Sequence, residues 1–507
     1  MKGKYFFTSR LFVFLVILGI QICFALVFLY WFSDLFPVIE GILFACSLLL
    51  VLYIINKRQD PAYKVVWIIP ILILPIAGFL LYFFFSQGRI RRRDRQYAME
   101  SYRAAASCLN DEDGICRLIE KKQEDPLRLI SYIRKTRQYP AFTNTRAQYF
   151  PMGELFFDRF LKELEQAERY IYMEFFMIKQ GRMWDSILDV LRRKAKAGVE
   201  VRLIYDDLGC AGHLEKQYAA ELGKQGIKCV VFNKLNPVLA SMFNNRDHRK
   251  IAILDGKTAF VCGTNLADEY INAERKYGTW KDACLMMKGD AAWGFLIIFL
   301  QTWDLITKKK TDVSYLQPEK DEQKADGLVQ PYADSPLDEV RLAENIFLSL
   351  IHGARRYLYI TTPYLVLNSA LKTAFATAAG KGVDVRIITP HIPDKKAVFL
   401  VTRANYRELL ENGVKIYEYT PGFIHAKTYT CDDEYAVVGT INTDYRSLFL
   451  NFECAALLYK SSAIKEMRED FLQTAKQCEQ VTLEKINAVP WPVRLAQSVM
   501  NAFAPML

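Results

Sequence analysis

The sequence predicts an α/β fold in which N-terminal transmembrane helices precede two pseudo-symmetric α/β sandwich halves. Apolar residues are concentrated before residue 90, strand-like and helix-like segments alternate through the remainder, and the same order of segments occurs twice. The 507 residues therefore divide into membrane segments (1–95), a first half (96–307), a linker (308–336), a second half (337–480) and an amphipathic C-terminal tail (481–507).

The composition excludes a disordered chain and is too apolar for an ordinary soluble enzyme, with 51% hydrophobic residues, 24% charged residues and a mean hydropathy of +0.02. The 66 Lys and Arg residues exceed the 56 Asp and Glu residues, and the net charge of +10 favours an anionic partner. Charge alone leaves nucleic acid and acidic lipid as equal candidates.

Three apolar segments, at about 11–32, 36–55 and 65–85, are candidate membrane segments. The first is long enough to cross a bilayer, and its aromatic end is typical of a membrane interface rather than of the cleavage site that a signal peptide requires. The third contains Pro70 and Pro75, which interrupt helices, so we expect it to be broken or re-entrant.

Basic residues set the expected orientation. Lys2, Lys4 and Arg10 favour a cytoplasmic N-terminus, and basic residues flank the third segment on both sides, at 57–64 and 89–95. Both flanks can lie inside only if this segment re-enters, which predicts a multi-pass protein with a cytoplasmic body. The eleven cysteines are scattered without metal-ligand spacing, so we expect reduced thiols.

Helices and strands alternate in the same order in both halves, which predicts βαβ units and a largely parallel sheet. In the first half we expect helices at 153–169, 184–197 and 214–225 and strands at 170–178, 200–205 and 228–232. In the second half we expect helices at 337–353, 369–380 and 397–412 and strands at 357–362, 383–389 and 414–419.

The C-terminal tail has apolar residues at helical spacing, at Val493, Ala496, Val499, Met500 and Phe503. A helix that packs on the protein core is the favoured interpretation, and a helix that lies in one leaflet of a membrane is the alternative.

Two of the five histidines begin the same pattern, H-x-K-x4-D. In each half an asparagine follows ten residues after the aspartate, beside a Gly-Thr pair, so the similarity extends beyond the motif. The candidate catalytic residues are His248, Lys250, Asp255, His425, Lys427 and Asp432, with Asn265 and Asn442 as candidate substrate-binding residues.

One histidine and one lysine suit a phosphodiester, because imidazole can attack phosphorus while ammonium neutralises the oxygens that gain charge. A second histidine can protonate the leaving alcohol and then deprotonate an incoming one, so two half-sites that meet provide a complete reaction. This chemistry requires no metal and no cofactor.

Each histidine also needs an acceptor that orients its ring. Asp282 and Glu453 are candidates for this role, and surface or salt-bridged carboxylates are an equally weighted interpretation of both. Glu174 is an acidic residue in an apolar strand; we favour a place in the site over pairing with a buried cation.

The chain resembles the phospholipase D superfamily and, within it, the bacterial cardiolipin synthases. Both motifs carry the resemblance, together with their flanking segments 243–247, 263–265, 268–270, 361–364, 439–442, 444–447 and 451–453. It covers nearly all of residues 140–480, and residues 55–88 resemble an apolar N-terminal module of the family. Cys262, where glycine is usual, and the segment 281–284 depart from the family pattern.

The resemblance implies two phospholipase D-like halves that transfer a phosphatidyl group from one phosphatidylglycerol to another, with cardiolipin and glycerol as products, at a bacterial cell membrane. His248 would be the nucleophile and His425 the general acid and then base, the lysines and Asn265 and Asn442 would hold phosphate, and Asp255 and Asp432 would brace the motifs. The expected partners are phosphatidylglycerol and anionic membrane lipid, not nucleic acid. A phospholipase D, or a transferase to another alcohol such as phosphatidylethanolamine, is the alternative; a nuclease and an inactive membrane scaffold are less favoured.

Overall fold

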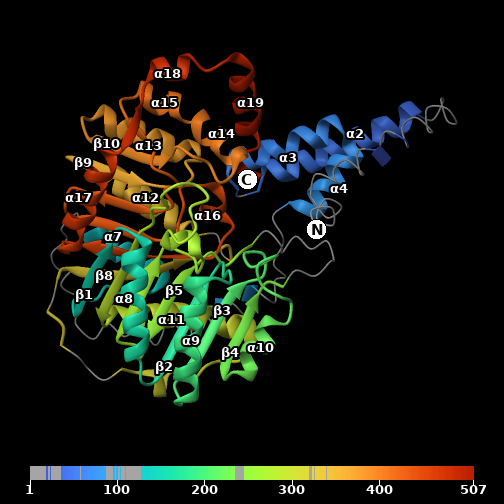
Figure 1. Ribbon diagram of the computed structural model, residues 1–507. Helices are drawn as coiled ribbons and strands as arrows, with labels where there is room; N and C mark the ends of the chain where they lie inside the picture. The colour runs from blue at the N-terminus through green and yellow to red at the C-terminus, as the bar shows by residue number, and fades with distance from the viewer. Residues whose placement is uncertain are drawn as a thin grey trace. The chain divides into compact units, whose positions relative to one another are not determined.

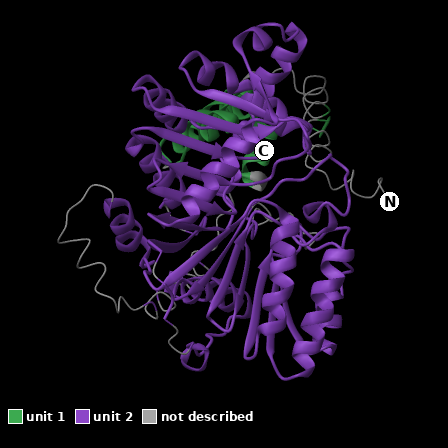
Figure 2. Cartoon of the chain, turned by 60° about the vertical axis from the view of Figure 1, so that its left-hand side comes forward, with its two compact units in different colours: residues 1–89, 236–244, 506 green, residues 90–235, 245–505, 507 purple. Residues whose placement is uncertain are grey.

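The computed structural model describes residues 36–57, 59–86, 127–234, 245–318, 322–324, 326–337 and 340–506, with isolated positions before residue 36 and between residues 94 and 110. The apolar segment at 11–32 therefore falls almost entirely outside the described residues. The chain forms two compact units (Figure 2), of which unit 1 comprises residues 1–89, 236–244 and 506 and unit 2 comprises the remainder.

The described residues of unit 1 form the apolar helices α2 (Phe36–Ile55), α3 (Pro61–Ile73) and α4 (Pro75–Phe85). The predicted break of the third apolar segment occurs at Leu74, because Pro75 has no N–H to continue α3 and instead begins α4. In the part of the chain that the structure describes, no helix has both the length and the apolar character needed to cross a membrane. The predicted spans at 36–55 and 65–85 are thus not confirmed.

The residues of unit 2 that the structure describes form two β-sheets. The first has the strand order β1-β7-β6-β5-β2-β3-β4. Its strands are β1 (Thr145–Phe150), β2 (Tyr170–Phe175), β3 (Glu200–Asp206), β4 (Ile227–Phe232), β5 (Lys250–Leu254), β6 (Thr258–Cys262) and β7 (Cys284–Gly289).

The second sheet repeats this order as β8-β14-β13-β12-β9-β10-β11 and adds β15 beyond β11. Its strands are β8 (Leu328–Asp334), β9 (Tyr357–Thr361), β10 (Asp384–Pro390), β11 (Lys415–Tyr419), β12 (Thr428–Cys431), β13 (Tyr435–Gly439), β14 (Glu453–Tyr459) and β15 (Cys478–Val481). Strand β8 lies inside the segment 308–336 that was expected to be a linker.

Both sheets are mixed, so the expectation of a largely parallel sheet is wrong. The strands of the βαβ units are parallel (β2-β3-β4 and β9-β10-β11), whereas the strands on the other side of β2 and β9 are antiparallel. The physical reason is the tight turn between β5 and β6. Asp255 and Gly256 adopt positive φ angles of 53° and 68° there, and such a short connection can join only antiparallel strands.

Helices flank the sheets (Figure 1). They are α7 (Leu127–Arg137), α8 (Gly153–Gln166), α9 (Arg182–Lys196), α10 (Tyr218–Lys224), α11 (Ala291–Thr307), α12 (Leu342–Gly353), α13 (Ser369–Gly380), α14 (Lys396–Ala404), α15 (Tyr406–Glu411), α16 (Tyr445–Phe449), α17 (Ala463–Ala475), α18 (Leu483–Asn487) and α19 (Trp491–Ala502). The single helix expected at 397–412 is two helices, α14 and α15.

The two halves share one hydrophobic core. Helix α11 is buried along most of its length and packs on strands of the first sheet and on β8 of the second. The same apolar cluster includes Phe295 and Phe299 of α11 and Phe347 and Tyr429 of the second half. The halves are therefore not independent domains, and their relative position is set by apolar packing.

Helix α19 differs from the expectation of a core-packing helix, since it contains no buried residue. The cysteines that the structure describes are free thiols.

Candidate active site

The two motifs meet where the halves face each other. Each histidine lies in a short loop that precedes the first strand of a hairpin, β5 or β12. The backbone N–H of His248 donates to the Phe452 carbonyl at 2.9 Å, and that of His425 donates to the Lys281 carbonyl at 2.7 Å. Each motif loop is thus joined to a segment of the opposite half.

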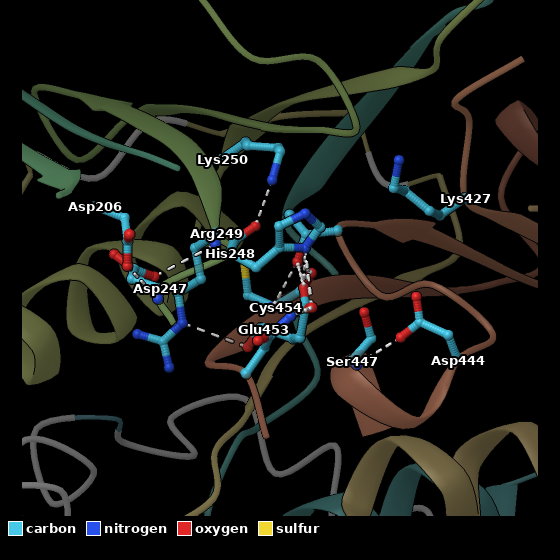
Figure 3. Close-up of polar contacts among 12 residues, drawn as sticks. Asp206, Asp247, His248, Arg249, Lys250, Lys427, Asp444, Ser447, Glu453 and Cys454 are labelled. Carbon is cyan, nitrogen blue, oxygen red and sulfur yellow. Dashed lines mark hydrogen bonds and ion pairs between the residues drawn. The ribbon is translucent and has the colours of Figure 1, made fainter. Parts of the chain in front are cut away.

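His248 is oriented by Glu453 (Figure 3), a buried residue at the start of β14. The His248 Nδ1 lies 2.9 Å from Oε1 and 3.1 Å from Oε2 of this carboxylate. Glu453 also accepts hydrogen bonds from the Thr440 hydroxyl and the Asn451 amide. These contacts hold the carboxylate under the ring and leave the His248 Nε2 for chemistry.

His425 is oriented by Asp282 in the same way, with its Nδ1 2.7 Å from Oδ2. A Cβ on Gly263 would lie 2.0 Å from the other oxygen of Asp282, so this carboxylate can occupy its place only because residue 263 is glycine. The carboxylates are therefore exchanged between the halves: Asp282 of the first half serves His425, and Glu453 of the second half serves His248.

Lys250 and Lys427 are buried, and each donates to the backbone carbonyl of the histidine in its own motif. In the view of Figure 3 the two lysines lie on either side of the His248 ring. Burial lowers the pKa of Lys250 to about 8 and that of Lys427 to about 7. Both amines thus need an anion nearby to stabilise their charged forms.

The two histidines are electrostatically similar. Burial, followed by the charges of Lys250 and Lys427, holds the pKa of His248 well below its ordinary value. Burial and the charge of Lys427 lower the pKa of His425 to about 4, against the opposing effect of Asp282. Both imidazoles are therefore neutral at pH 7 before an anionic substrate binds.

The two carboxylates differ. Burial raises the pKa of Glu453 to about 7, and the charge of Lys250 only partly opposes it. Burial acts on Asp282 too, but the charges of His425 and Lys427 outweigh it and hold the pKa of Asp282 below its ordinary value. His425 therefore has the more fully charged partner, which favours its imidazolium form more strongly.

The asparagines that follow the two motifs, Asn265 and Asn442, are buried. The Asn265 side chain is already paired, accepting from the Met177 N–H at 3.2 Å and donating to the Tyr270 hydroxyl at 2.6 Å. The Asn442 Oδ1 has no hydrogen-bond partner among the described residues. The two positions are thus not equivalent, although the sequence spacing is the same.

Asp255 and Asp432 lie at the far ends of the motif strands. Asp255 lies five positions beyond Lys250 along an extended strand, a separation of roughly 16 Å. The carboxylate of Asp255 accepts the N–H groups of Glu168, Arg169 and Tyr170, each at 2.8 Å. Asp432 accepts three successive N–H groups, at 2.7, 2.8 and 2.8 Å, from residues 355–357. These contacts support bracing of the hairpins rather than contact with substrate.

Glu174 requires a correction. It is fully buried, and its Oε1 lies 3.5 Å from the Arg249 guanidinium. The structure thus shows pairing with a buried cation, and not the favoured expectation of a residue that lines the site. Arg249 also donates to the Glu453 carbonyl at 3.4 Å, so Glu174 supports the site from behind.

Asp206 is absent from the site residues that the sequence predicts, yet it braces the first motif. Asp206 is fully buried and accepts the backbone N–H of Asp247 at 3.1 Å and that of Leu208 at 2.8 Å. It therefore anchors the loop that carries His248. The sequence does show an acidic residue at the end of an apolar strand. It does not show that this residue accepts from Asp247, which lies 41 residues later.

The surroundings of the two rings differ in polarity. Three aromatic rings lie within 6.0 Å of the His425 ring, measured between centroids: Tyr270, Trp280 and Phe423. The described ring nearest to His248 is Phe176, at 5.2 Å, and the charges of Lys395 and Arg446 also act on this histidine. The residues that the structure describes contain no cluster of three or more His, Cys, Asp or Glu side chains arranged to hold a metal ion.

Comparisons with known proteins agree with this geometry. A family model described as cardiolipin synthase, PLD-like domain, matches residues 160–279 and 347–475, one match in each half. A second model, phospholipase D-nuclease N-terminal, matches residues 45–87. Among solved structures, a phosphatidylserine synthase of Haemophilus influenzae has a TM-score of 0.57 at 16% identity, and covers 76% of this chain and 100% of its own. This likeness supports the fold.

Relatives match over almost the whole chain. An uncharacterized protein of Streptococcus mutans is 39% identical over 457 residues, which are 90% of this chain and 99% of that protein. A cardiolipin synthase of Geobacillus kaustophilus is 33% identical over 507 residues, 99% of each chain. With a family match in both halves and this similarity over the full length, the chain belongs to the cardiolipin synthase family of the phospholipase D superfamily.

Proposed function

We propose that this protein is a phosphatidyltransferase that makes cardiolipin and glycerol from two molecules of phosphatidylglycerol through a phosphohistidine. The observation that carries this proposal is the exchange of carboxylates, in which each motif histidine is held by an acid from the other half. Such an arrangement builds one site from two histidines and two lysines, which matches the needs of a two-step displacement at a phosphodiester. Family membership provides the phospholipid substrate class.

His248 acts as the nucleophile. Its Nε2 attacks phosphorus, the bond from phosphorus to the glycerol oxygen breaks, and His425 donates a proton to that oxygen. Binding of the anionic phosphodiester offsets the charges of Lys250 and Lys427, which raises the pKa of His425 toward neutrality. The ionised Asp282 beneath His425, compared with the Glu453 pKa of about 7 beneath His248, supports this division of roles.

The second step reverses the first with a new alcohol. His425, now neutral, removes the proton from a hydroxyl of the second phosphatidylglycerol, whose oxygen attacks phosphorus and releases His248. Lys250 and Lys427 neutralise the phosphate oxygens in both steps. The Oδ1 of Asn442, which is unpaired among the described residues, is an acceptor and therefore suits a hydroxyl of the substrate rather than a phosphate oxygen.

The protein acts at a membrane. The apolar helices α2 to α4 and the family match at 45–87 support an attachment through the N-terminal region. We infer a multi-pass protein of the bacterial cell membrane with its catalytic body in the cytoplasm, which the basic residues at 89–95 support.

A phospholipase D, or a transferase to another acceptor such as phosphatidylethanolamine, whose free amino group would take the place of the hydroxyl, is the second candidate. The same phosphohistidine serves these reactions, because only the resolving nucleophile changes. Mass spectrometry of the products from phosphatidylglycerol, with water, ethanolamine lipid and glycerol lipid in competition, distinguishes them. Cardiolipin as the main product supports the synthase, and phosphatidic acid as the main product would exclude it.

The experiment that tests the mechanism uses His425→Ala with phosphatidyl-p-nitrophenol labelled on phosphorus. This leaving group needs no proton, so the first step proceeds without the acid, but without the base the phosphoenzyme resolves slowly and label is expected to accumulate on His248. His352→Ala, an exposed histidine of α12, is the matched control and should turn over normally. Unchanged turnover by His425→Ala would refute the assignment, and trapping by His248→Ala instead would reverse the two roles.

A further inference from the structure

Helix α19 exposes a stripe of large apolar side chains. The stripe consists of Trp491, Leu495, Val499 and Phe503, whose exposed fractions are 69%, 55%, 50% and 43%. Their spacing of four residues places them on one face of the helix and its C-terminal end. Soluble proteins usually expose such residues singly, so a continuous row indicates a surface that is covered by something apolar.

The opposite face of α19 is anchored. Gln497, Met500 and Asn501 are half-buried, and the helix packs along α14, beside which it lies in Figure 1. The side of α19 that packs on α14 is thus less apolar than the side that is exposed. The more apolar side therefore faces away from the protein.

The segments that form and support the stripe contain basic residues and no acidic ones. Residues 488–507 contain no Asp or Glu, and Arg494 is their one charged residue. Helix α14 also contains no acid, and Lys395 and Lys396 at its start are exposed. An apolar row beside basic side chains is complementary to an anionic lipid surface, where acyl chains accept the row and headgroups accept the charges.

Helix α14 connects this surface to the active site. The Leu365 N–H donates to the Thr402 hydroxyl of α14 at 3.2 Å, and the Asn405 amide at the end of α14 donates to the Leu365 carbonyl at 3.1 Å. Leu365 belongs to the loop that follows β9, and β9 ends beside the strand that begins directly after Lys427. The helix that supports α19 therefore borders the motif of the second half.

We propose that the stripe of α19 inserts into the surface of an anionic bilayer and holds the active site at the level of the lipid headgroups. This inference rests on the proposed function for its lipid substrate. It assigns membrane contact to the C-terminal end of the chain in addition to the apolar N-terminal helices.

The first test measures insertion without measuring activity. Full-length protein is added to vesicles of phosphatidylglycerol and phosphatidylcholine, with the phosphatidylcholine brominated on its acyl chains. The fluorescence of wild type minus that of Trp491→Phe isolates Trp491 among the seven tryptophans. We expect quenching of this difference signal, and unquenched Trp491 fluorescence on vesicles that bind the protein would overturn the proposal.

The second test separates docking from chemistry. Leu495→Ser with Val499→Ser should lower turnover of phosphatidylglycerol in vesicles roughly tenfold and change turnover in detergent micelles less than about twofold. Leu155→Ser, in α8 and 52% exposed, is the matched control and should behave as wild type in both. Equal turnover of the double variant and wild type on vesicles would contradict the proposal.

The results of these tests distinguish an error in the insertion proposal from an error in the proposed function. If wild type forms no cardiolipin in micelles, the proposed function is wrong. Quenching of Trp491 still shows in that case whether α19 inserts into the bilayer. If the double variant changes the oligomeric state measured by sedimentation and Trp491 stays unquenched, the stripe is a contact between protein chains, and the proposal is wrong.

Discussion

At the scale of single residues, the two half-sites look alike in sequence and differ in electrostatics. His248 and His425 each direct Nδ1 at a buried carboxylate, but the pKa of Glu453 is raised to about 7 while that of Asp282 is held below its ordinary value. A nucleophile needs a neutral ring, and a general acid benefits from an anion beside its imidazolium. The asymmetry of the carboxylates therefore matches the asymmetry of the roles.

The different roles of the two carboxylates predict that their variants respond differently to a change of the leaving group. Asp282→Asn and Glu453→Gln should each lower kcat on phosphatidylglycerol by about 100-fold or more, because each removes the charge that orients a catalytic histidine. On phosphatidyl-p-nitrophenol, whose leaving group needs no proton, Asp282→Asn should release the first equivalent of p-nitrophenol at close to the wild-type rate, and Glu453→Gln should not. Rapid-mixing measurement of this burst checks the first step alone, because the second step still needs His425 as the base; the reverse pattern would exchange the roles of the histidines.

The buried lysines predict the pH dependence. A lysine is charged below its pKa, so Lys427, with a pKa of about 7, and Lys250, with a pKa of about 8, lose their protons as the pH rises through this window. We expect kcat/KM in micelles to fall across about pH 7 to 8. In Lys427→Arg the guanidinium stays charged, so the residual activity should decline at a higher pH; an unshifted decline would show that Lys427 does not cause it.

At the scale of elements, a hairpin in each half positions the motif. Asp255 and Asp432 have left-handed backbones, with φ angles of 53° and 56°, and each accepts three backbone N–H groups from the segment that leads into β2 or β9. The carboxylates fasten the hairpin at one end, and the histidines act at the other. The aspartate of each motif thus holds the hairpin strand in position.

Asp432→Asn tests this bracing role. Asparagine keeps the left-handed backbone but replaces the carboxylate that accepts three N–H groups, so the free energy of unfolding should fall by about 1.5–3 kcal/mol. The kcat of the folded fraction should stay within about threefold, because the substitution is distant from phosphorus. Urea unfolding in detergent measures the first effect. Glu434→Gln, an exposed neighbour, is the control, and a large loss of kcat at unchanged stability would contradict the bracing role.

The elements also show which parts of the fold the sequence could predict. The helices and strands of the βαβ units were found from periodicity, within a few residues at most ends. The motif strands β5 and β6 are not among the strands that the sequence predicts, because the prediction rests on alternating strands and helices and these two strands form a hairpin with no helix between them. Strand β8 was assigned to a linker, because the charged segment before it obscured a strand that pairs with β14, over 100 residues later.

At the scale of the whole molecule, one chain builds one site. The halves share a core through α11, and the backbone bridges Asp247–Phe452 and Lys281–Ile424 join the motif loops across the interface. Both histidines, and both carboxylates that orient them, thus come from the same chain.

Mixing two inactive variants tests this organisation. His248→Ala and His425→Ala, each full length, should show no recovery of cardiolipin formation when they are mixed in micelles, because neither chain contains a complete site. When wild type is mixed with either variant at constant total protein, the activity should be proportional to the fraction of wild-type chains. Recovery to a quarter or more of the wild-type rate, by contrast, would indicate sites assembled between chains.

The sequence by itself identified the residues that we propose as the reacting groups, since two H-x-K-x4-D motifs in a repeated order of elements suit phosphodiester chemistry, and it identified Asp282 and Glu453 as candidate orienting acids. Only the tertiary structure decided which acid serves which histidine, why the two differ in charge, and that the apolar face of α19 is exposed. Spacing along a chain determines which side chains share a strand or a helix face. The contacts between two loops, and the burial that shifts a pKa, depend on how the sheets meet through their shared core, which no local pattern encodes.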